Sequence, residues 1–369
     1  MAENLLDLNI GKLGFGFMRL PSLADGFDMG QIDKMVDAFL ESGFTYFDTA
    51  YVYRGSERAL CQSLVERYPR DRFQIATKLN LGGVNPGDDL NVFFEKSLER
   101  LGVDYLDVYL IHGIGTRTGD KDDTLGAWDL LNSLKAAGKA KHIGFSFHGT
   151  PEKLDEILTK HPETDVVQIQ LNYLDWENKD VQSKRLYETI RKHNKPVIIM
   201  EPVKGGMLAG EGSAIAKVFK AADPSASVAS WAFRFAAALE GVLVTLSGMS
   251  AFSQMEDNLA TFKDFRSLSE GEMKTVGEAV AALSAIPRIP CTECGYCLEG
   301  CPQKIKIPAL MKVYSDYLVY QTADSIARQY RFTESPPAGS CEKCRKCEET
   351  CPQGVHIVET LEKVSALFD

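Results

Sequence analysis

Residues 291–302 read CTECGYCLEGCP, and residues 341–352 read CEKCRKCEETCP. Both stretches follow the pattern C-x2-C-x2-C-x3-C-P, so eight of the nine cysteines stand in two matched runs near the end of the chain. Three thiols from one tight loop and a fourth from farther away form the usual ligand set of an iron–sulfur cube. The proline after each fourth cysteine fixes the direction in which the chain leaves the loop. These runs predict a small cluster-binding domain at residues 286–369.

The spacing resembles that of bacterial ferredoxins with two [4Fe–4S] clusters, in which the fourth cysteine of each run binds the other cluster. This resemblance implies one cluster on Cys291, Cys294, Cys297 and Cys351, and a second on Cys341, Cys344, Cys347 and Cys301. Zinc is one alternative, but zinc sites usually show cysteine pairs rather than triplets followed by Cys-Pro. Disulfides are the other, and they belong mainly to small secreted domains. The clusters would either transfer single electrons or serve as structural pins.

The sequence around the two runs predicts mainly helices. Two prolines in Ile286–Pro290 indicate a linker that ends a preceding domain, residues 1–285. Helical patterns cover Ile307–Arg331 and Ile357–Leu367, with a loop over Thr333–Ser340. The two halves form an approximate internal repeat, and the long helical insert between the runs favours an α-helical ferredoxin-like domain.

The composition is that of an ordinary globular protein, with 44% hydrophobic and 25% charged residues and a formal net charge of −10. The acidic balance argues against nucleic acid as a partner, because phosphate backbones require a basic surface. We expect no membrane span, since no apolar run has the necessary length. The first nine residues lack the basic and apolar regions of a leader, so we expect a cytoplasmic protein. The ninth cysteine, Cys61, lies in a helical pattern and is expected to be a small buried residue.

Residues 10–285 alternate short apolar runs with longer helical patterns. The eight strand candidates are Leu13–Phe17, Thr45–Phe47, Phe73–Thr77, Leu106–Ile111, His142–Phe145, Val166–Ile169, Val197–Met200 and Val242–Leu246. The helical patterns between them include Gly30–Ser42, Asp89–Leu101, Thr124–Ala137, Pro151–Lys160 and Lys179–Lys192. Eight β–α units predict an α/β fold of the (β/α)8 TIM-barrel type. A doubly wound sheet is the alternative, but it would require a glycine-rich turn between the first strand and a helix.

Four polar residues follow successive strand candidates, where barrel enzymes place their chemistry. Asp48 and Tyr53 follow the second strand, Lys78 the third and His112 the fourth. An ammonium beside a tyrosine stabilises the phenolate, lowers the pKa of the hydroxyl and makes it a better general acid. An aspartate can position that lysine, and a histidine can orient a carbonyl oxygen. The four residues together predict proton transfer at the barrel mouth.

These segments resemble the aldo-keto reductase family, in its branch with a C-terminal two-cluster ferredoxin domain. The matching motifs are LGFGFMRLP at Leu13–Pro21, FDTA at Phe47–Ala50 with Tyr53, GSE at Gly55–Glu57, Lys78 and His112. The resemblance covers essentially the whole chain. It implies that Tyr53 donates a proton to a carbonyl undergoing reduction, that Lys78 and Asp48 tune this tyrosine, and that His112 positions the substrate oxygen.

The resemblance also implies a nicotinamide cofactor. Its expected contacts are Ser146, Gln168, Gly205, Gly206, Gly248, Met249, Gln254, Asp257 and Asn258. The chain departs from the family pattern at Phe147, which follows Ser146 where asparagine is common, and at Met200, where many members stack an aromatic ring. Basic residues that would bind a 2′-phosphate are missing at Gly248 and Gln254. We therefore expect NAD(H) to be favoured over NADP(H).

Three functions remain open at this point. The first is a carbonyl/alcohol oxidoreductase whose clusters exchange electrons with a ferredoxin or another electron carrier. The second is an NAD(P)-linked carbonyl reductase with purely structural clusters, and the third is a non-enzymatic redox sensor. The intact set of four residues disfavours the third, and the altered nicotinamide positions favour the first.

Overall fold

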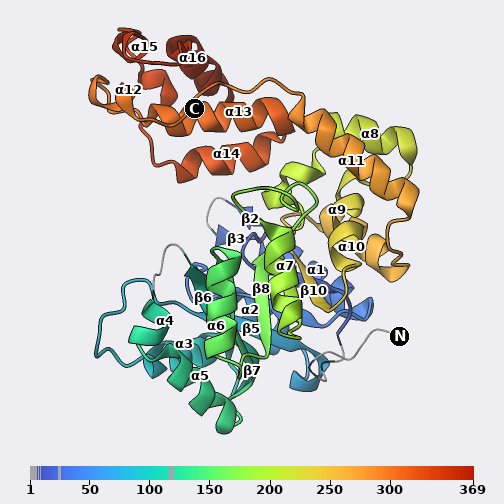
Figure 1. Ribbon diagram of the computed structural model, residues 1–369. Coiled ribbons are helices and arrows are strands. Elements are labelled where there is room, and N and C mark those ends of the chain that lie inside the picture. The colour runs from blue at the N-terminus through green and yellow to red at the C-terminus, as the bar shows by residue number, and fades with distance from the viewer. Residues whose placement is uncertain (1–5, 7, 9, 24–25, 116–119) are drawn as a thin grey trace. The chain divides into compact units, whose positions relative to one another are not determined.

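The computed structural model describes residues 6, 8, 10–23, 26–115 and 120–369 (Figure 1). Most of the N-terminal segment that is expected to lack a leader lies outside these residues. The chain forms two compact units. The first contains residues 1–202 and 232–268, and the second contains residues 203–231 and 269–369.

Eight parallel strands close a barrel in the first unit, which confirms the (β/α)8 prediction and excludes a doubly wound sheet. The strands are β1 Leu13–Gly16, β4 Tyr46–Asp48, β5 Gln74–Leu79, β6 Leu106–Gly115, β7 Ala140–His148, β8 Val166–Gln170, β9 Val197–Met200 and β10 Val242–Ser247. Each strand pairs with the next in chain order, and β1 pairs with both β4 and β10. A short antiparallel hairpin, β2 Ser22–Leu23 and β3 Gly26–Phe27, follows β1.

Small and large side chains alternate inside the barrel so that the strands can close. A side chain at Gly14 would lie 2.8 Å from Leu246 and 3.2 Å from the ring of Tyr46. A side chain at Gly144 would lie 1.9 Å from the carbonyl oxygen of Val166. The interior is therefore filled from neighbouring strands, as expected for a packed barrel core. Its buried apolar residues include Tyr46, Ala76, Val108, Leu110, Val166, Ile198 and Val244.

Helices cover the barrel between the strands (Figure 1). They are α1 Met29–Glu41, α2 Ser56–Leu60, α3 Asn91–Leu101, α4 Lys121–Thr124, α5 Ala127–Ala136, α6 Pro151–Lys160, α7 Ser183–Lys192, α9 Val228–Ala237 and α10 Phe252–Lys263. The start of α6 shows why the sequence predicts these boundaries well. Thr150 accepts a hydrogen bond from the backbone of Lys153, and Pro151 occupies the first turn, where its missing N–H costs nothing.

The expected burial of Cys61 is wrong. The residue begins a π-helical turn, Cys61–Val65, that continues α2, and its thiol is only half-buried. The Cys61 Sγ lies 3.8 Å from the carboxylate of Glu66. Periodicity predicts a helix here, but the wider turn rotates Cys61 toward the surface.

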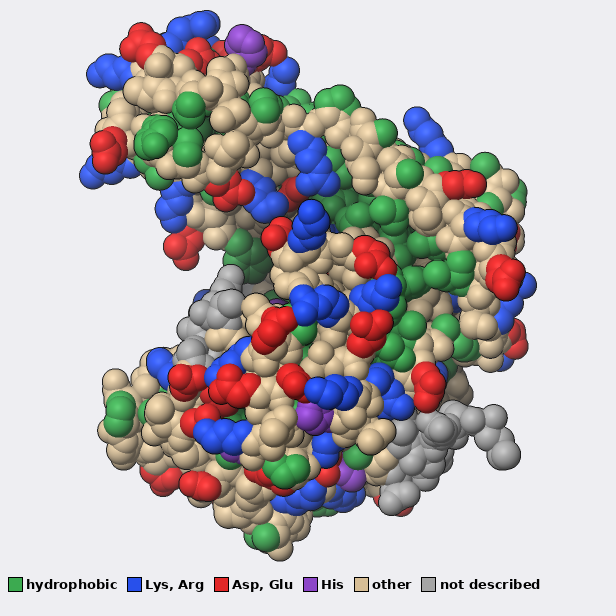
Figure 2. All heavy atoms as spheres, in the orientation of Figure 1, with side chains coloured by type: hydrophobic (Ala, Val, Ile, Leu, Met, Phe, Trp, Pro, Cys, Tyr) green, Lys and Arg blue, Asp and Glu red, His purple; other side chains and the backbone are tan. Residues whose placement is uncertain are grey.

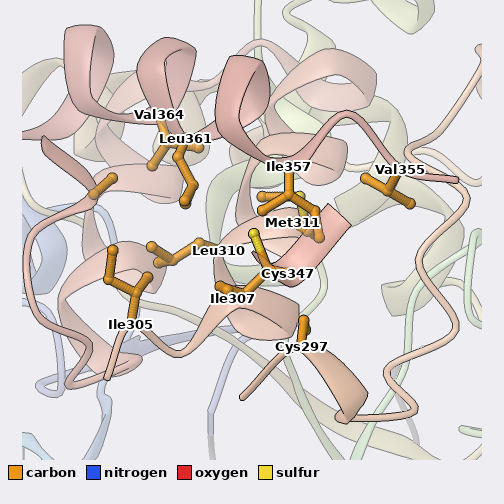
Figure 3. Packing of buried hydrophobic residues seen from close by; sticks show 11 residues of the cluster. Cys297, Ile305, Ile307, Leu310, Met311, Cys347, Val355, Ile357, Leu361 and Val364 are labelled. Atoms are coloured by element: carbon orange, nitrogen blue, oxygen red, sulfur yellow. The ribbon is translucent and has the colours of Figure 1, made fainter. Parts of the chain in front are cut away.

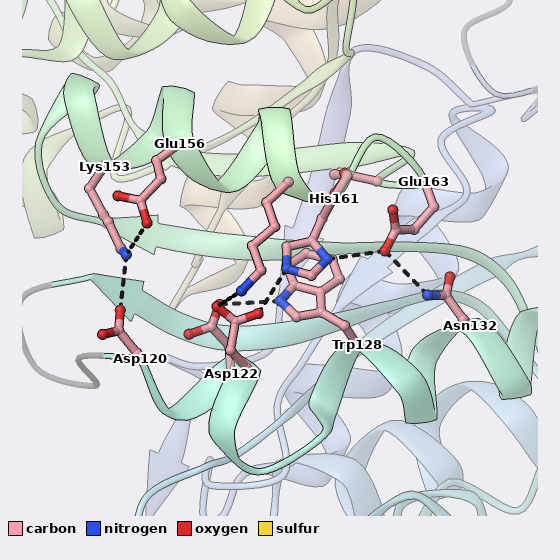
Figure 4. Close-up of polar contacts among 11 residues, drawn as sticks. Asp120, Asp122, Trp128, Asn132, Lys153, Glu156, His161 and Glu163 are labelled. Atoms are coloured by element: carbon pink, nitrogen blue, oxygen red, sulfur yellow. Dashed lines mark hydrogen bonds and ion pairs between the residues drawn. The ribbon is translucent and has the colours of Figure 1, made fainter.

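A polar network ties α4, α5 and α6 together on the flank of the barrel (Figure 4). The ring of His161 stacks on Trp128 with centroids 4.1 Å apart, and Trp128 Nε1 donates to the buried Asp122 at 3.2 Å. The two ring nitrogens of His161 lie 2.9 Å from Asp123 and 3.1 Å from Glu163. Stacking and hydrogen bonding together fix this histidine as a structural residue.

Helices form most of the second unit. They are the 3₁₀ segment η4 Lys204–Ala209, α8 Ala214–Ala222, α11 Glu270–Ser284, α12 Tyr296–Glu299, α13 Ile307–Tyr320, α14 Ala323–Phe332, η5 Ala338–Ser340, α15 Lys346–Glu349 and α16 Ile357–Phe368. The single helix expected over Ile307–Arg331 is two helices. Gln321, with φ of 51°, ends α13 in the left-handed region and turns the chain into α14. The expected α-helical character of this region is confirmed.

The internal repeat is visible in the backbone at an offset of 50 residues, as from Cys297 to Cys347. Helix α12 corresponds to α15, and α13 begins at Ile307 as α16 begins at Ile357. The two halves share one core, in which the buried Cys297 and Cys347 lie among apolar side chains (Figure 3). This core includes Ile305, Ile307, Leu310, Met311, Val355, Ile357, Leu361 and Val364.

Acidic and basic side chains are interspersed over the barrel face that Figure 2 shows. Among the described residues, no helix has the length and apolar character needed to cross a membrane.

Candidate active site and cysteine loops

Three adjacent strands bring the predicted acid–base residues together. Asp48 ends β4, Lys78 lies in β5, and both side chains are buried. The ammonium of Lys78 lies 2.6 Å from Asp48 Oδ1 and donates to the carbonyl oxygen of Thr49 at 2.7 Å. It also lies 5.5 Å from the centre of the Tyr53 ring. The ring of Tyr53 meets that of His112 edge-on, with centroids 5.7 Å apart.

The turn after β4 is held in place by its own hydrogen bonds. The backbone N–H of Tyr53 donates to Ala50 at 3.0 Å, and the N–H of Ser56 donates to Tyr53 at 3.0 Å. The buried hydroxyl of Ser56 donates to the carbonyl of Phe17 at 2.8 Å. Gly55, with φ of 76°, provides the left-handed residue that ends the turn and starts α2. These hydrogen bonds therefore fix the turn that carries Tyr53.

A bulge sets the orientation of His112. The sequence predicts this residue just after a strand that ends at Ile111, but β6 continues to Gly115 with a register shift between Ile111 and Ile114. His112 and Gly113 of β6 face the single Ser146 of β7, and Gly113 has φ of 68°, so the one extra residue bends the strand. Bulges of this kind re-aim side chains beside active sites.

The pKa of Tyr53 differs from the expectation. Burial raises the pKa of its hydroxyl above the ordinary value, and Lys78 opposes this as the largest lowering influence. Asp48 and Glu201 raise this pKa further, and Arg19 lowers it. The net shift is upward, so the protein by itself keeps Tyr53 protonated. Sequence reasoning considered only the ammonium and missed the larger effect of desolvation.

His112 is held neutral. Burial, with the nearby charge of Lys78 and with His148, lowers the pKa of its imidazole to about 3. At neutral pH the ring therefore presents one N–H donor and one acceptor nitrogen.

Two of the predicted nicotinamide contacts lie side by side on adjacent strands. Ser146 of β7 is in register with Gln168 of β8, and both side chains are buried. Ser146 Oγ accepts a hydrogen bond from the N–H of Gly113 at 2.7 Å. Gln168 Oε1 is buried without a hydrogen-bond partner in the described structure. A buried orphan acceptor beside a hydroxyl fits a ligand carboxamide, which brings both a donor and an acceptor.

The remaining predicted contacts follow β9 and β10. Gly205 and Gly206 belong to η4 in the second unit and have φ of 67° and 98°. Gly248 and the buried Met249 follow β10 directly. Gln254 accepts the N–H of Ser250 at 2.8 Å, and the carbonyl oxygen of Asp257 accepts the hydroxyl of Thr261 at 3.0 Å. Asn258 donates to Ser247 at 2.9 Å. Gln254 and Asn258 thus brace the loop after β10 from α10.

The structure adds a charged pair whose role sequence reasoning missed. Arg19 and Glu201 form an ion pair with Nη2 and Oε1 3.3 Å apart. A side chain at Gly248 would lie 3.6 Å from Arg19 Cβ, so the aliphatic stem of Arg19 lies beside this glycine while its guanidinium pairs with Glu201. Glu201 has φ of 58°, and its carbonyl oxygen accepts from Asn172 at 3.1 Å. The place of Arg19 near the end of the first strand motif could have indicated that it lies at the barrel mouth. Its ion pair with Glu201 could not be predicted, because the two residues are far apart in the sequence.

Each cysteine run forms a loop around a hollow in the second unit. One hollow, of about 350 Å³ including its open side, is lined by Cys291, Cys294, Cys297 and Cys351. The other, of about 330 Å³, is lined by Cys341, Cys344, Cys347 and Cys301. In each, three thiols come from one run and the fourth from the other run.

The thiol sets fit iron–sulfur cubes. Apolar side chains complete both hollows, and Ile307 contributes to each of them. Within the described part of the chain, no three cysteine, histidine or acidic side chains gather closely enough to bind one ion. Four thiols around a space of this size are instead suited to a polynuclear cluster, whose irons each take one thiolate.

Comparisons with known proteins agree with this organisation. L-galactose dehydrogenase of Arabidopsis thaliana is 25% identical over 305 residues, which is 76% of this chain and 93% of that protein. The 9,11-endoperoxide prostaglandin H2 reductase of Trypanosoma cruzi is 27% identical over 71% of this chain and 88% of its own length. An aldo/keto reductase structure from Klebsiella pneumoniae with NADP and acetate has a TM-score of 0.60 and 21% identity, covering 73% of this chain and 91% of that chain.

Two family profiles divide the chain between them. The aldo/keto reductase family matches residues 12–281, and the 4Fe–4S dicluster domain matches residues 290–356. The first match alone covers more than half of the sequence. The chain is therefore an oxidoreductase that belongs to the aldo/keto reductase family and carries a C-terminal 4Fe–4S dicluster domain.

Proposed function

We propose that the barrel interconverts a small carbonyl compound and its alcohol with a nicotinamide dinucleotide, and that the C-terminal domain exchanges electrons with a ferredoxin-like carrier. The observation that carries the proposal is the cluster of Tyr53, Lys78, Asp48 and His112 at the ends of three adjacent strands. The four-thiol hollows support the second half.

Tyr53 is the proton donor in this proposal. Its raised pKa keeps the hydroxyl protonated, so the proton is available when the carbonyl oxygen becomes an alkoxide. Lys78 favours the phenolate that remains, because its ammonium lies 5.5 Å from the ring centre. Asp48 and the Thr49 carbonyl fix the ammonium and satisfy its hydrogen bonds in a buried site. In the oxidative direction the same groups accept the proton.

His112 orients the carbonyl oxygen. A neutral imidazole can donate one N–H to that oxygen without adding a second cation beside Lys78. The edge-on contact between the rings of His112 and Tyr53 supports this role, because it keeps the two side chains close enough to act on one oxygen. Two donors converging on one oxygen stabilise the negative charge that develops there.

A bound nicotinamide would supply or accept the hydride. Gln168 Oε1 would accept from its carboxamide NH₂, and the hydroxyl of Ser146 would donate to the carboxamide oxygen. Gly205, Gly206, Gly248 and Met249 would approach the rest of the dinucleotide with their backbones. Gln254, Asp257 and Asn258 would shape the loop after β10 that receives it.

The preferred dinucleotide depends on charge. Two solved neighbours contain NADP or NADPH, which favours the phosphorylated form. Against this, the guanidinium of Arg19, whose aliphatic stem lies beside Gly248, already pairs with the carboxylate of Glu201. A 2′-phosphate would have to compete with that carboxylate for the guanidinium. The proposal therefore keeps NAD(H) as the better ligand.

The C-terminal domain would bind two clusters, which supply one-electron transfer. Cys294 and Cys344 are exposed, whereas Cys297 and Cys347 are buried. Each hollow therefore has one thiol at the surface, where an external carrier can approach. This exposure favours electron exchange over a purely structural role, since a structural pin gains nothing from a solvent-facing side.

Replacing Tyr53 with phenylalanine should lower kcat for carbonyl reduction by about 10²-fold or more, because the positioned acid is lost. Lys78→Met should be comparably damaging, since the phenolate loses its counter-charge. Dinucleotide dissociation constants, measured by fluorescence titration, should change little in Tyr53→Phe. A wild-type kcat in either variant would remove the assignment.

The imidazole of His112 should stay neutral between pH 5 and 8, because its pKa is lowered to about 3. Its ring-proton NMR signal, assigned by loss in His112→Gln, should not shift over this range. Protonation should begin only well below the ordinary histidine pKa of about 6.5. A titration of this signal with a midpoint near 6.5 would contradict a buried neutral donor.

Iron content tests the crosswise ligand sets. Anaerobically purified protein should contain about eight irons, and Cys294→Ser/Cys297→Ser should retain about four. Adding Cys351→Ser to that double variant should remove no more iron, whereas adding Cys301→Ser should remove the rest. The opposite result would mean that each run binds a cluster with its own four cysteines.

A reduced-cluster electron paramagnetic resonance signal after addition of NADH or a reduced ferredoxin would then establish electron exchange.

Titration with each dinucleotide should show NADH binding at least as tightly as NADPH. Glu201→Gln should release Arg19 and strengthen NADPH binding several-fold, by about 1 kcal/mol for a fivefold gain. Glu240→Gln is the matched control. Glu240 also pairs with an arginine, Arg191, but it lies in the exposed loop between α9 and β10. Wild-type protein that binds NADPH about tenfold more tightly than NADH would show that Arg19 is available despite Glu201.

A further inference from the structure

The segment that follows β9 has an unusual backbone. Lys204, Gly205 and Gly206 have φ of 48°, 67° and 98°, so three consecutive residues lie in the left-handed region. This conformation is unfavourable for Lys204 and persists only when surrounding structure fixes it. Gly205 and Gly206 are also two of the proposed dinucleotide contacts. The contacts that fix the backbone of this segment are therefore expected to affect cofactor binding.

Helix α14 of the cluster-bearing domain holds it. Arg328 Nη2 donates to the carbonyl oxygen of Gly205 at 3.4 Å and to the hydroxyl of Ser325 at 3.2 Å. A side chain at Gly206 would lie 2.6 Å from Ser325 Oγ. The backbone of η4 thus packs directly against Ser325 and Arg328, one helical turn apart.

A second contact fixes the end of the same segment. A side chain at Gly210 would lie 2.5 Å from Thr322 Cγ2 and 3.0 Å from the carbonyl oxygen of Tyr320. Tyr320 ends α13, and Thr322 precedes α14. The segment is therefore seated on the corner between the two helices as well as on α14.

The turn between α13 and α14 is connected to the cysteine loops through α13. Ile307, at the start of α13, lines both four-thiol hollows, and Met311 lines one of them. The buried carboxylate of Asp316 on α13 accepts from Gln329 of α14 at 2.8 Å, which locks the two helices together. A series of contacts therefore runs from the hollows along α13, from Asp316 to Gln329 of α14, and from Arg328 to Gly205.

We propose that Arg328 is a positioning residue for the dinucleotide, and that the cluster-bearing helices keep the Gly205–Gly206 segment in its binding conformation. This inference rests on the proposed dinucleotide site. Bound clusters would join both cysteine runs around the start of α13, so they would stabilise α13 and α14 and keep the segment preorganised. When they are lost, the segment is released, and part of the binding free energy goes into ordering it again. By linkage, a bound dinucleotide must stabilise the clusters by the same coupling free energy.

The test compares two arginines on one helix in cluster-loaded protein. Arg328→Met should raise the NADH dissociation constant about fivefold or more, the lower range of allosteric coupling. Arg331→Met, which removes the same charge from an exposed position on α14, should leave it unchanged. Arg328→Lys should restore part of the affinity. Iron content is measured on every sample, and an Arg328→Met protein with full iron and wild-type affinity would overturn the inference.

A steric test does not depend on charge. Gly206→Ala should weaken NADH binding, because the new methyl group meets Ser325 Oγ at 2.6 Å. Ser325→Ala should recover part of that loss in the double variant, although the strain from φ of 98° remains. No recovery in the double variant would show that α14 does not control the segment.

Cluster stability gives the reciprocal measurement. Saturating NADH should slow the loss of cluster absorbance in the presence of an iron chelator in wild-type protein, and the slowing should be smaller in Arg328→Met. Wild-type protein that binds neither NADH nor NADPH would remove the proposed function itself. Wild-type binding without protection of the clusters would remove only the coupling.

Discussion

An ammonium buried in a protein interior must be surrounded by acceptors, because desolvating it costs several kcal/mol. Lys78 meets this requirement with Asp48 and the Thr49 carbonyl at the end of the neighbouring strand. The requirement fixes the ends of β4 and β5 against each other and directs the turn that carries Tyr53. On the far side of β5, buried Glu57 accepts from Thr77 at 2.8 Å and pairs with Arg100 at 3.1 Å. Each buried charge at this mouth thus has a partner from another element.

The two chemistries of the chain differ in electron number. A hydride carries two electrons, whereas a [4Fe–4S] cluster normally transfers one, and the sequence shows no flavin fingerprint. A cube in each hollow would let the domain hold two electrons, which equals the number in a hydride. The common core around Cys297 and Cys347 places both hollows in one folded body. A pair of clusters would therefore match the electron count of the barrel chemistry.

Local patterns predicted most of the architecture. The eight strands, the barrel and the helical character of the C-terminal domain follow from periodicity and from cysteine spacing, which depend on neighbouring residues. The misses arose where the backbone departs locally from a regular helix or strand. The bulge at His112, the turn at Gln321 and the half-exposed Cys61 each involve one or two residues that depart from a regular period.

The residues that the structure brings together at the barrel mouth could be predicted from the sequence, but their pKa shifts could not. Residue types at strand ends indicated Tyr53 and its neighbours, and the fourth cysteine of each run does line the other run's hollow. Desolvation reverses the expected pKa shift of Tyr53, and burial cannot be read from spacing alone. The ion pair of Arg19 with Glu201 and the contact of Arg328 with Gly205 join residues more than 100 positions apart.

The exchange of fourth cysteines has a consequence for biosynthesis. Residues 291–301 are synthesised before Cys341 and Cys351. Neither hollow can gain its full set of thiols during that interval, because each set includes residues from both runs. A cluster in either hollow would therefore be completed only after synthesis of the second run, although three of the four thiols around one hollow belong to the first run.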